Sequence, residues 1–218
     1  MREEIEKILR SVESVKKQNG LTQEVTVVAA TKMVDAERIN LLPSYGITIA
    51  GENRVQELLE KYDKVKGLEW HLIGSLQTNK VKYIIDKVKL IHSVDRKSLA
   101  DEIEKQAKKR GITMDVLVEI NIGGEESKSG VSPDEAKELM EYINSLGSVN
   151  LRGVMSVLPI NAPDEMYAKM KEFSSYAREK YAAPVLSMGM SGDYEKAVKY
   201  GSNMIRIGSA VFGKRIYA

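Results

Sequence analysis

The feature that most constrains the fold of this chain is a regular alternation of short apolar runs with helical patterns. The runs are rich in β-branched or other apolar residues and lie at 25–31, 47–51, 69–74, 89–94, 115–121, 151–157, 185–190 and 203–208. Most segments between them carry apolar residues at helical spacing, as Leu99, Ile103 and Ala107 do. Strands that alternate with helices pair in parallel through right-handed crossovers. The alternation therefore predicts an α/β fold built on a parallel sheet.

The number of repeated units favours a barrel over an open sheet. Several runs, such as 116–120, are apolar at nearly every position, which is typical of strands covered on both faces. Eight βα units in 218 residues predict a single-domain (β/α)8 TIM barrel over residues 1–218, smaller than the roughly 250 residues typical of that fold. A doubly wound open sheet remains the alternative.

Two helix ends can be placed from the sequence. Residues 2–19 have Ile5, Ile8 and Val12 at helical spacing before Gly20, which predicts an extra N-terminal helix with a glycine cap. The segment 132–135 has the pattern of a capping box with proline at the first helical position. We expect a helix to begin there and to end at Gly147.

Composition excludes several classes of function. The chain has no cysteine, which excludes disulfides, thiolate catalysis and cysteine-ligated zinc. Its 33 basic and 31 acidic residues are interspersed, so no nucleic-acid partner is predicted. The charged N-terminus is unlike a secretory signal, and no apolar run approaches the roughly 18 residues of a membrane span. These observations predict a cytoplasmic protein with no membrane partner.

The two histidines give no sign of a metal site. We interpret His71 and its neighbour Trp70 as a hydrogen-bonded core pair, and His92 has no evident partner. A zinc site needs three or four ligands of this kind. No metal is therefore predicted.

The chemistry is expected where barrels keep it, at the carboxyl ends of the strands. Lys32 directly follows the first run. The parity of the last run places Ile205 and Ile207 against the outer helices, so Arg206 faces the barrel. An inward arginine is costly unless it meets an acceptor.

Two glycine-containing turns near Arg206 suggest an anion site. Gly208 and Ser209 follow the last run, and Ser191 and Gly192 precede a short helical segment after the seventh. Backbone N–H groups and hydroxyls in such turns favour a phosphate. A lysine opposite an anion site suits a phosphorylated aldehyde such as pyridoxal 5′-phosphate (PLP). Ordinary turn glycines and a solvated lysine are the alternative.

Eight segments of the chain, in order, resemble the pyridoxal phosphate homeostasis proteins (the YggS/PROSC family). These segments are 31–32, 51–57, 70–74 with 76–80, 92–95, 128–130, 152–155, 186–191 and 206–209. Two details depart from the family pattern: Ser209 stands where threonine is common, and no proline follows Lys32 closely.

The resemblance implies a barrel like the N-terminal domain of alanine racemase, with PLP bound as a Schiff base. Lys32 would hold the aldehyde and Arg206 would face the pyridine nitrogen. The phosphate would lie against Ser191, Gly192, Gly208 and Ser209, with Ser187 nearby, and Asn53 and Met188 would lie close to the ring.

A carrier is expected in preference to an enzyme. An arginine at the pyridine nitrogen weakens carbanion chemistry, and racemisation needs a second acid/base group, which alanine racemase takes from a separate β-domain that has no counterpart in this sequence. We therefore predict a monomer that buffers PLP, delivers it to apo-enzymes and has no catalytic residues. A slow amino-acid racemase and a Schiff-base phosphosugar aldolase are the alternatives. Lys128 is expected on the rim, either as a transient second acceptor of the cofactor or as a solvated loop lysine.

Overall fold

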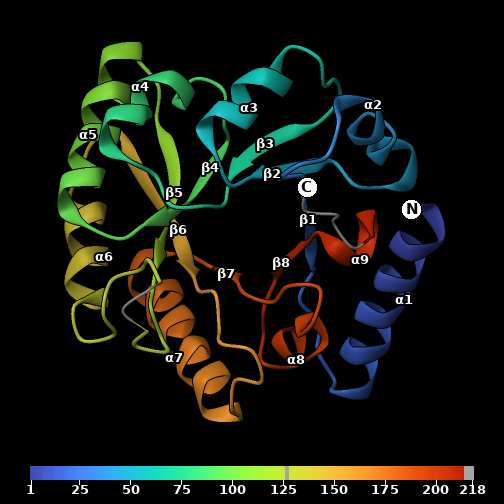
Figure 1. Cartoon of the computed structure of the whole chain (residues 1–218). Helices are drawn as coiled ribbons and strands as arrows, with labels where there is room; N and C mark the ends of the chain where they lie inside the picture. Colours follow the sequence, from blue (N-terminus) through green and yellow to red (C-terminus); the bar gives the residue numbers. More distant parts are fainter. Residues whose placement is uncertain (126–127, 214–218) are drawn as a thin grey trace.

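The structure, a computed structural model, describes residues 1–125 and 128–213 and contains a closed barrel of parallel strands (Figure 1). Each strand pairs with the next along the chain, and β1 pairs with β8, which sets Thr26 opposite Met204. This closing pair confirms the barrel and excludes the open sheet. The strands are β1 Thr26–Ala30, β2 Ile49–Glu52, β3 Glu69–Leu72, β4 Leu90–Val94, β5 Met114–Glu119, β6 Val149–Met155, β7 Val185–Ser187 and β8 Met204–Ile207.

Helical segments follow the strands and cover the outside of the barrel (Figure 1). They are α2 Ala36–Ile39, the 3-10 helix η1 Leu42–Tyr45, α3 Val55–Tyr62, the 3-10 helix η2 Thr78–Lys80, α4 Val81–Ile84, α5 Lys97–Arg110, α6 Ala136–Asn144, α7 Asp164–Tyr181, α8 Tyr194–Lys199 and α9 Ser209–Phe212. The predicted extra helix is α1 Arg2–Gln18, which lies against α8 and α9.

Helix α1 ends as its sequence predicts. Gly20 adopts a φ of +62°, the left-handed conformation that glycine takes without steric cost. Its N–H donates to the carbonyl of Lys17, and the N–H of Leu21 donates to that of Lys16 at 2.9 Å. These two bonds satisfy carbonyls that the helix itself leaves unpaired.

The start of α6 differs from the prediction. Ser132 and Glu135 do interact, because the Ser132 hydroxyl accepts from the Glu135 N–H at 3.4 Å and donates to its carboxylate at 2.5 Å. Residues 133–135, however, form a turn, and the regular helix runs only from Ala136 to Asn144. The capping pattern marks the entry to the helix but not its first residue.

Alternation along each strand divides the apolar residues into two layers. Outward residues such as Ile205 and Ile207 pack with the helices in one large core. A smaller apolar layer fills the barrel interior with Val28, Ile73, Leu90, Leu117, Met155 and Met204. We call this second group the inner apolar layer. The functional residues discussed below lie on the same inward face, nearer the carboxyl ends of the strands.

Candidate functional site

A cavity of about 530 Å³ opens at the carboxyl ends of the strands. It is lined by residues at or after the ends of β1, β2, β3, β6, β7 and β8: Ala30, Lys32, Asn53, Ile73, Val157, Leu158, Pro159, Ile160, Asn161, Met190, Ser191, Gly192, Asp193, Arg206, Gly208 and Ser209. All the expected cofactor residues except Ser187 and Met188 are in this set. The sequence therefore predicted the place of the cavity and most of its polar lining.

Lys32 reaches the cavity because of strand parity. Val28 belongs to the inner apolar layer and Ala30 packs against it, so Lys32 continues the inward face one step past the end of β1. Its side chain is partly buried and lines the cavity. Within residues 1–125 and 128–213, its amine has no hydrogen-bond or ion-pair partner. A primary amine without a partner beside a cavity is well placed to react with an aldehyde.

The turns after β7 and β8 meet at the cavity and expose hydrogen-bond donors. The Ser191 hydroxyl accepts from the backbone N–H groups of Gly208 at 3.3 Å and Ala210 at 3.2 Å. These long bonds join the two turns, and the hydroxyl of Ser209 lines the same cavity. Hydroxyls and N–H groups are the donors that a phosphate accepts from.

The turn after β7 is held rigidly in place. Gly189 adopts a φ of +98°, and a Cβ there would lie 2.6 Å from that of Ala197, so only glycine fits. Asp193 accepts the Met190 N–H at 2.7 Å and the Tyr167 hydroxyl at 2.9 Å. The donors of this turn are therefore fixed before any ligand arrives.

Arg206 lines the cavity and is largely buried, and both of its terminal guanidinium nitrogens donate to acceptors. One guanidinium nitrogen donates to the Ser187 hydroxyl at 2.6 Å and to its carbonyl at 2.9 Å, and the other donates to the Ser156 carbonyl at 2.9 Å. Burial lowers the pKa of Arg206 to about 10, so it remains a cation at neutral pH. The acceptors that the sequence requires for this arginine are thus provided by Ser187 in β7 and by Ser156, the residue that follows β6.

A chain of polar side chains continues from Arg206 across the barrel. The Ser187 hydroxyl is 3.0 Å from His92 Nδ1, and His92 Nε2 is 3.0 Å from His71 Nδ1. Burial lowers the pKa of His71 to about 4 and also holds the pKa of His92 well below its usual value. Both rings are therefore neutral at neutral pH.

This chain corrects the interpretation of the histidines. His71 is a hydrogen-bonded core residue as expected, but its partner is His92 and not Trp70, so His92 has a partner that its own sequence neighbours do not reveal. Trp70 is buried on the opposite, outward face of β3. The missed signal was parity, which sends both histidines inward on adjacent strands. Among the described residues no group of three or more His, Cys, Asp or Glu side chains could hold a metal ion.

Two further expectations concern residues outside the cavity lining. Met188 follows the inward Ser187, so its side chain points outward and is fully buried in the core beneath the helices. Its side chain therefore does not line the cavity in which the cofactor is expected. Lys128 forms an ion pair with Glu125 at 2.6 Å and is absent from the lining, and its neighbours 126–127 lie outside the described residues.

Comparison with known proteins places the whole chain in one family. The family model for the alanine racemase N-terminal domain matches residues 5–215. The chain is 44% identical to the pyridoxal phosphate homeostasis protein of Aquifex aeolicus, over 99% of this chain and 98% of that protein. It is 34% identical to the protein of the same name from Vibrio cholerae, over 100% and 98% of the two chains.

Solved structures agree with this result. The structure of PipY from Synechococcus elongatus with PLP bound has a TM-score of 0.77 and 30% identity, covering 94% of this chain and 99% of that one. Alanine racemase from Clostridium difficile shares the fold, with a TM-score of 0.79 at 16% identity over 99% of this chain and 60% of that one. Separately, none of the helices within the described ranges is long and apolar enough to cross a membrane.

Proposed function

The chain belongs to the alanine racemase N-terminal domain family and, within it, to the pyridoxal phosphate homeostasis proteins, and on this premise we propose that it binds PLP and takes part in PLP homeostasis. The observation that carries the proposal is the amine of Lys32, which is unpartnered within the described part of the chain and shares a cavity with the hydroxyls of Ser191 and Ser209. A phosphorylated aldehyde needs these two kinds of group. The PipY structure described as having PLP bound supports the choice of ligand.

Each end of the cofactor has suitable residues in this chain. Lys32 would hold PLP as a Schiff base: its neutral amine adds to the aldehyde carbon, and the aldehyde oxygen leaves as water. The phosphate would accept hydrogen bonds from Ser191, Gly192, Gly208 and Ser209, which all line the cavity. These turns already direct donors to one point, where the Ser191 hydroxyl accepts two of them.

The remaining residues would orient the ring. Arg206 would face the pyridine nitrogen, with Ser187 behind it as a hydrogen-bond acceptor, and Asn53 would lie beside the ring. Met188 is not part of this proposal, because its side chain points into the outer core. When bound, PLP supplies an electrophilic aldehyde and an electron-withdrawing ring.

The environment of Arg206 supports a carrier rather than an efficient enzyme. PLP stabilises carbanions best when its ring nitrogen is protonated, which an acidic partner favours. A buried cation that already donates to three acceptors has the opposite effect. The protein would hold PLP, buffer the free aldehyde and deliver it to apo-enzymes, as a monomer in the cytoplasm with residues 1–218 acting as one domain.

Borohydride trapping tests the proposal. Protein mixed with PLP is reduced and digested, and its peptides are mapped by mass, with Lys32→Ala and the exposed control Lys64→Ala in parallel. We expect a phosphopyridoxyl group on Lys32 in the parent and in the control, and none in Lys32→Ala. No adduct on Lys32 would contradict the proposal, and trapping of a sugar phosphate on Lys32 in a parallel mixture without PLP would indicate an aldolase.

Two activity assays separate a carrier from an enzyme. Loaded protein should reactivate an apo-enzyme that uses PLP, faster than the same amount of Lys32→Ala mixed with PLP does. Conversion of L- to D-amino acids above the rate of free PLP would instead support the racemase alternative.

A further inference from the structure

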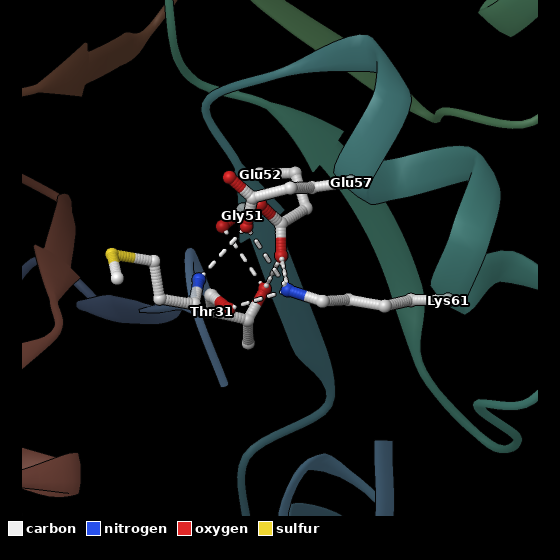
Figure 2. A network of polar contacts seen from close by, with 6 residues as sticks. Thr31, Gly51, Glu52, Glu57 and Lys61 are labelled. Atoms are coloured by element: carbon white, nitrogen blue, oxygen red, sulfur yellow. Dashed lines mark hydrogen bonds and ion pairs between the residues drawn. The ribbon is translucent and has the colours of Figure 1, made fainter. Parts of the chain in front are cut away.

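A buried polar network joins Thr31, the residue before Lys32, to Glu52 at the end of β2 and to Lys61 on α3 (Figure 2). Glu52, the last residue of β2, is fully buried, and one of its carboxylate oxygens accepts from the Thr31 hydroxyl and from Lys61 Nζ, both at 2.7 Å. The other oxygen is buried without a partner in the described part of the chain. Lys61 on α3 is thus the only cation that the described structure places against this carboxylate.

The same lysine is anchored by two further acceptors. Lys61 Nζ donates to the backbone carbonyl of Thr31 at 2.9 Å and, more weakly, to the Glu57 carboxylate at 3.4 Å. Figure 2 shows its side chain reaching from α3 to this point between the strand ends. With three N–H bonds and three acceptors, Lys61 is saturated as a donor. It is therefore a structural cation and unsuited to act as a nucleophile.

The network forms hydrogen bonds with the residues on both sides of Lys32. Before it, the carbonyl and the hydroxyl of Thr31 are both held. After it, the Met33 N–H donates to Glu57 at 2.8 Å, and Met33 adopts a φ of +59°, an unusual left-handed conformation for a side chain of this size. Such a conformation persists only where the surroundings impose it.

Electrostatics makes the three charged residues depend on one another. Burial raises the pKa of Glu52, while Lys61 and Thr31 act to lower it. Burial acts to raise the pKa of Glu57 as well, but the Met33 N–H and Lys61 bring it below its usual value. Removing Lys61 would leave a buried carboxylate without a counter-ion, which is strongly unfavourable.

We propose that Lys61, Glu52 and Glu57 are positioning residues for Lys32. They fix the two peptide units that flank Lys32, so that its amine is presented to the cavity, and they thereby set how readily it forms and keeps the Schiff base with PLP. None of the three lines the cavity, so they act through the backbone rather than by touching the cofactor. This inference rests on the proposed function. It assigns a role to three residues that would not contact the cofactor themselves.

The test compares two ligands that differ only at the reacting group. Pyridoxamine 5′-phosphate has the same ring and phosphate as PLP, but it carries an amine and cannot form a Schiff base with a lysine. For Lys61→Met we expect the affinity for PLP to fall about tenfold, since small misplacements of a reacting group have effects of this order or larger. The affinity for pyridoxamine 5′-phosphate should stay within about twofold of the parent. The exposed Lys64→Met, three residues further along, is the matched control and should match the parent for both ligands.

A second pair of variants isolates the bond to Met33 in case Lys61→Met folds poorly. Glu57→Gln keeps an acceptor for the Met33 N–H, and Glu57→Leu removes it. We expect only the leucine variant to lose affinity for PLP and to show faster hydrogen exchange at the Met33 amide.

The outcomes separate this inference from the proposed function. Equal losses for both ligands would mean that the network merely supports the barrel mouth, and unchanged affinities would mean that it does nothing for Lys32; either result overturns the inference. If the parent itself bound PLP no more tightly than pyridoxamine 5′-phosphate and gave no adduct on Lys32, the proposed function would fail first.

Discussion

Acidification should destabilise this protein through two histidines that burial keeps neutral. His71 and His92 are hydrogen-bonded to each other at 3.0 Å inside the barrel, and burial lowers the pKa of both. In the unfolded chain each would titrate near its ordinary value of 6.5. Because the folded pKa values are the lower ones, the unfolded chain binds protons that the folded chain does not, and stability falls as the pH drops below about 6.5.

The size of the effect follows from the pKa of His71. With a folded value of about 4 against 6.5, acidification from about pH 7.5 to about pH 5.5 costs the folded state about 1.3 kcal/mol through this residue. Burial also holds the pKa of His92 below its usual value, so His92 contributes to the loss in the same direction. Acidification over this range should therefore cost the parent about 1.3 kcal/mol more than it costs His71→Gln, which cannot titrate at this position.

Urea unfolding at the two pH values measures this difference. Trp70, the single tryptophan, is buried next to His71 and should report unfolding by its fluorescence. Glu52 and Glu119, whose pKa values burial raises, act in the opposite direction, because the folded chain holds their protons more tightly. Since both glutamates remain in His71→Gln, their effect cancels when the two proteins are compared.

The comparison can refute the reasoning directly. If His71→Gln lost as much stability as the parent over this pH range, then His71 would not be the group that resists protonation.

Two further predictions concern the strands beneath the cavity. Gly153→Ala should cost more than about 4 kcal/mol of stability, because its φ is +148° and a Cβ would lie 1.9 Å from the Val185 carbonyl oxygen; a thermal melt within a few degrees of the parent would contradict this. Ser187→Ala removes the hydroxyl between Arg206 and His92 and should cost about 2 kcal/mol in urea unfolding, and a cost below about 0.5 kcal/mol would show that the polar chain is not coupled there.

The fold could be predicted because its signal is local and repeated. Each short apolar run predicts a strand, and each set of apolar residues at helical spacing predicts a helix. The predicted strands all occur in the structure, and their ends differ from the observed ones by a few residues at most. The choice between a barrel and an open sheet depends on whether β1 pairs with β8, a contact between Val28 and Arg206 and their neighbours at opposite ends of the chain. No local pattern encodes that contact, so only the number of units favoured the barrel.

A site residue could be predicted where its place along a single strand is enough to show that its side chain points into the barrel. Lys32 and Arg206 follow from the direction in which a single strand points its side chains. The partners of His92 come from strands 21 and 95 residues away, so they could not be inferred from its own neighbourhood. Lys61 looks like an ordinary helical lysine in the sequence, and only the packing of α3 on the strand ends buries it against Glu52.

Strand parity also explains why the site is sensitive to residues that never touch it. Thr31 and Lys32 are adjacent, yet one points outward into the Glu52 network and the other inward to the cavity, and Ser187 and Met188 divide in the same way. A shift of one residue in either strand would exchange these roles completely. The inner apolar layer opposes such a shift, because its side chains would have to leave the barrel interior for the helix-covered face. The chemistry at the carboxyl ends of the strands is therefore set by apolar packing one layer below, and substitutions in that layer should alter the presentation of Lys32 before they unfold the barrel.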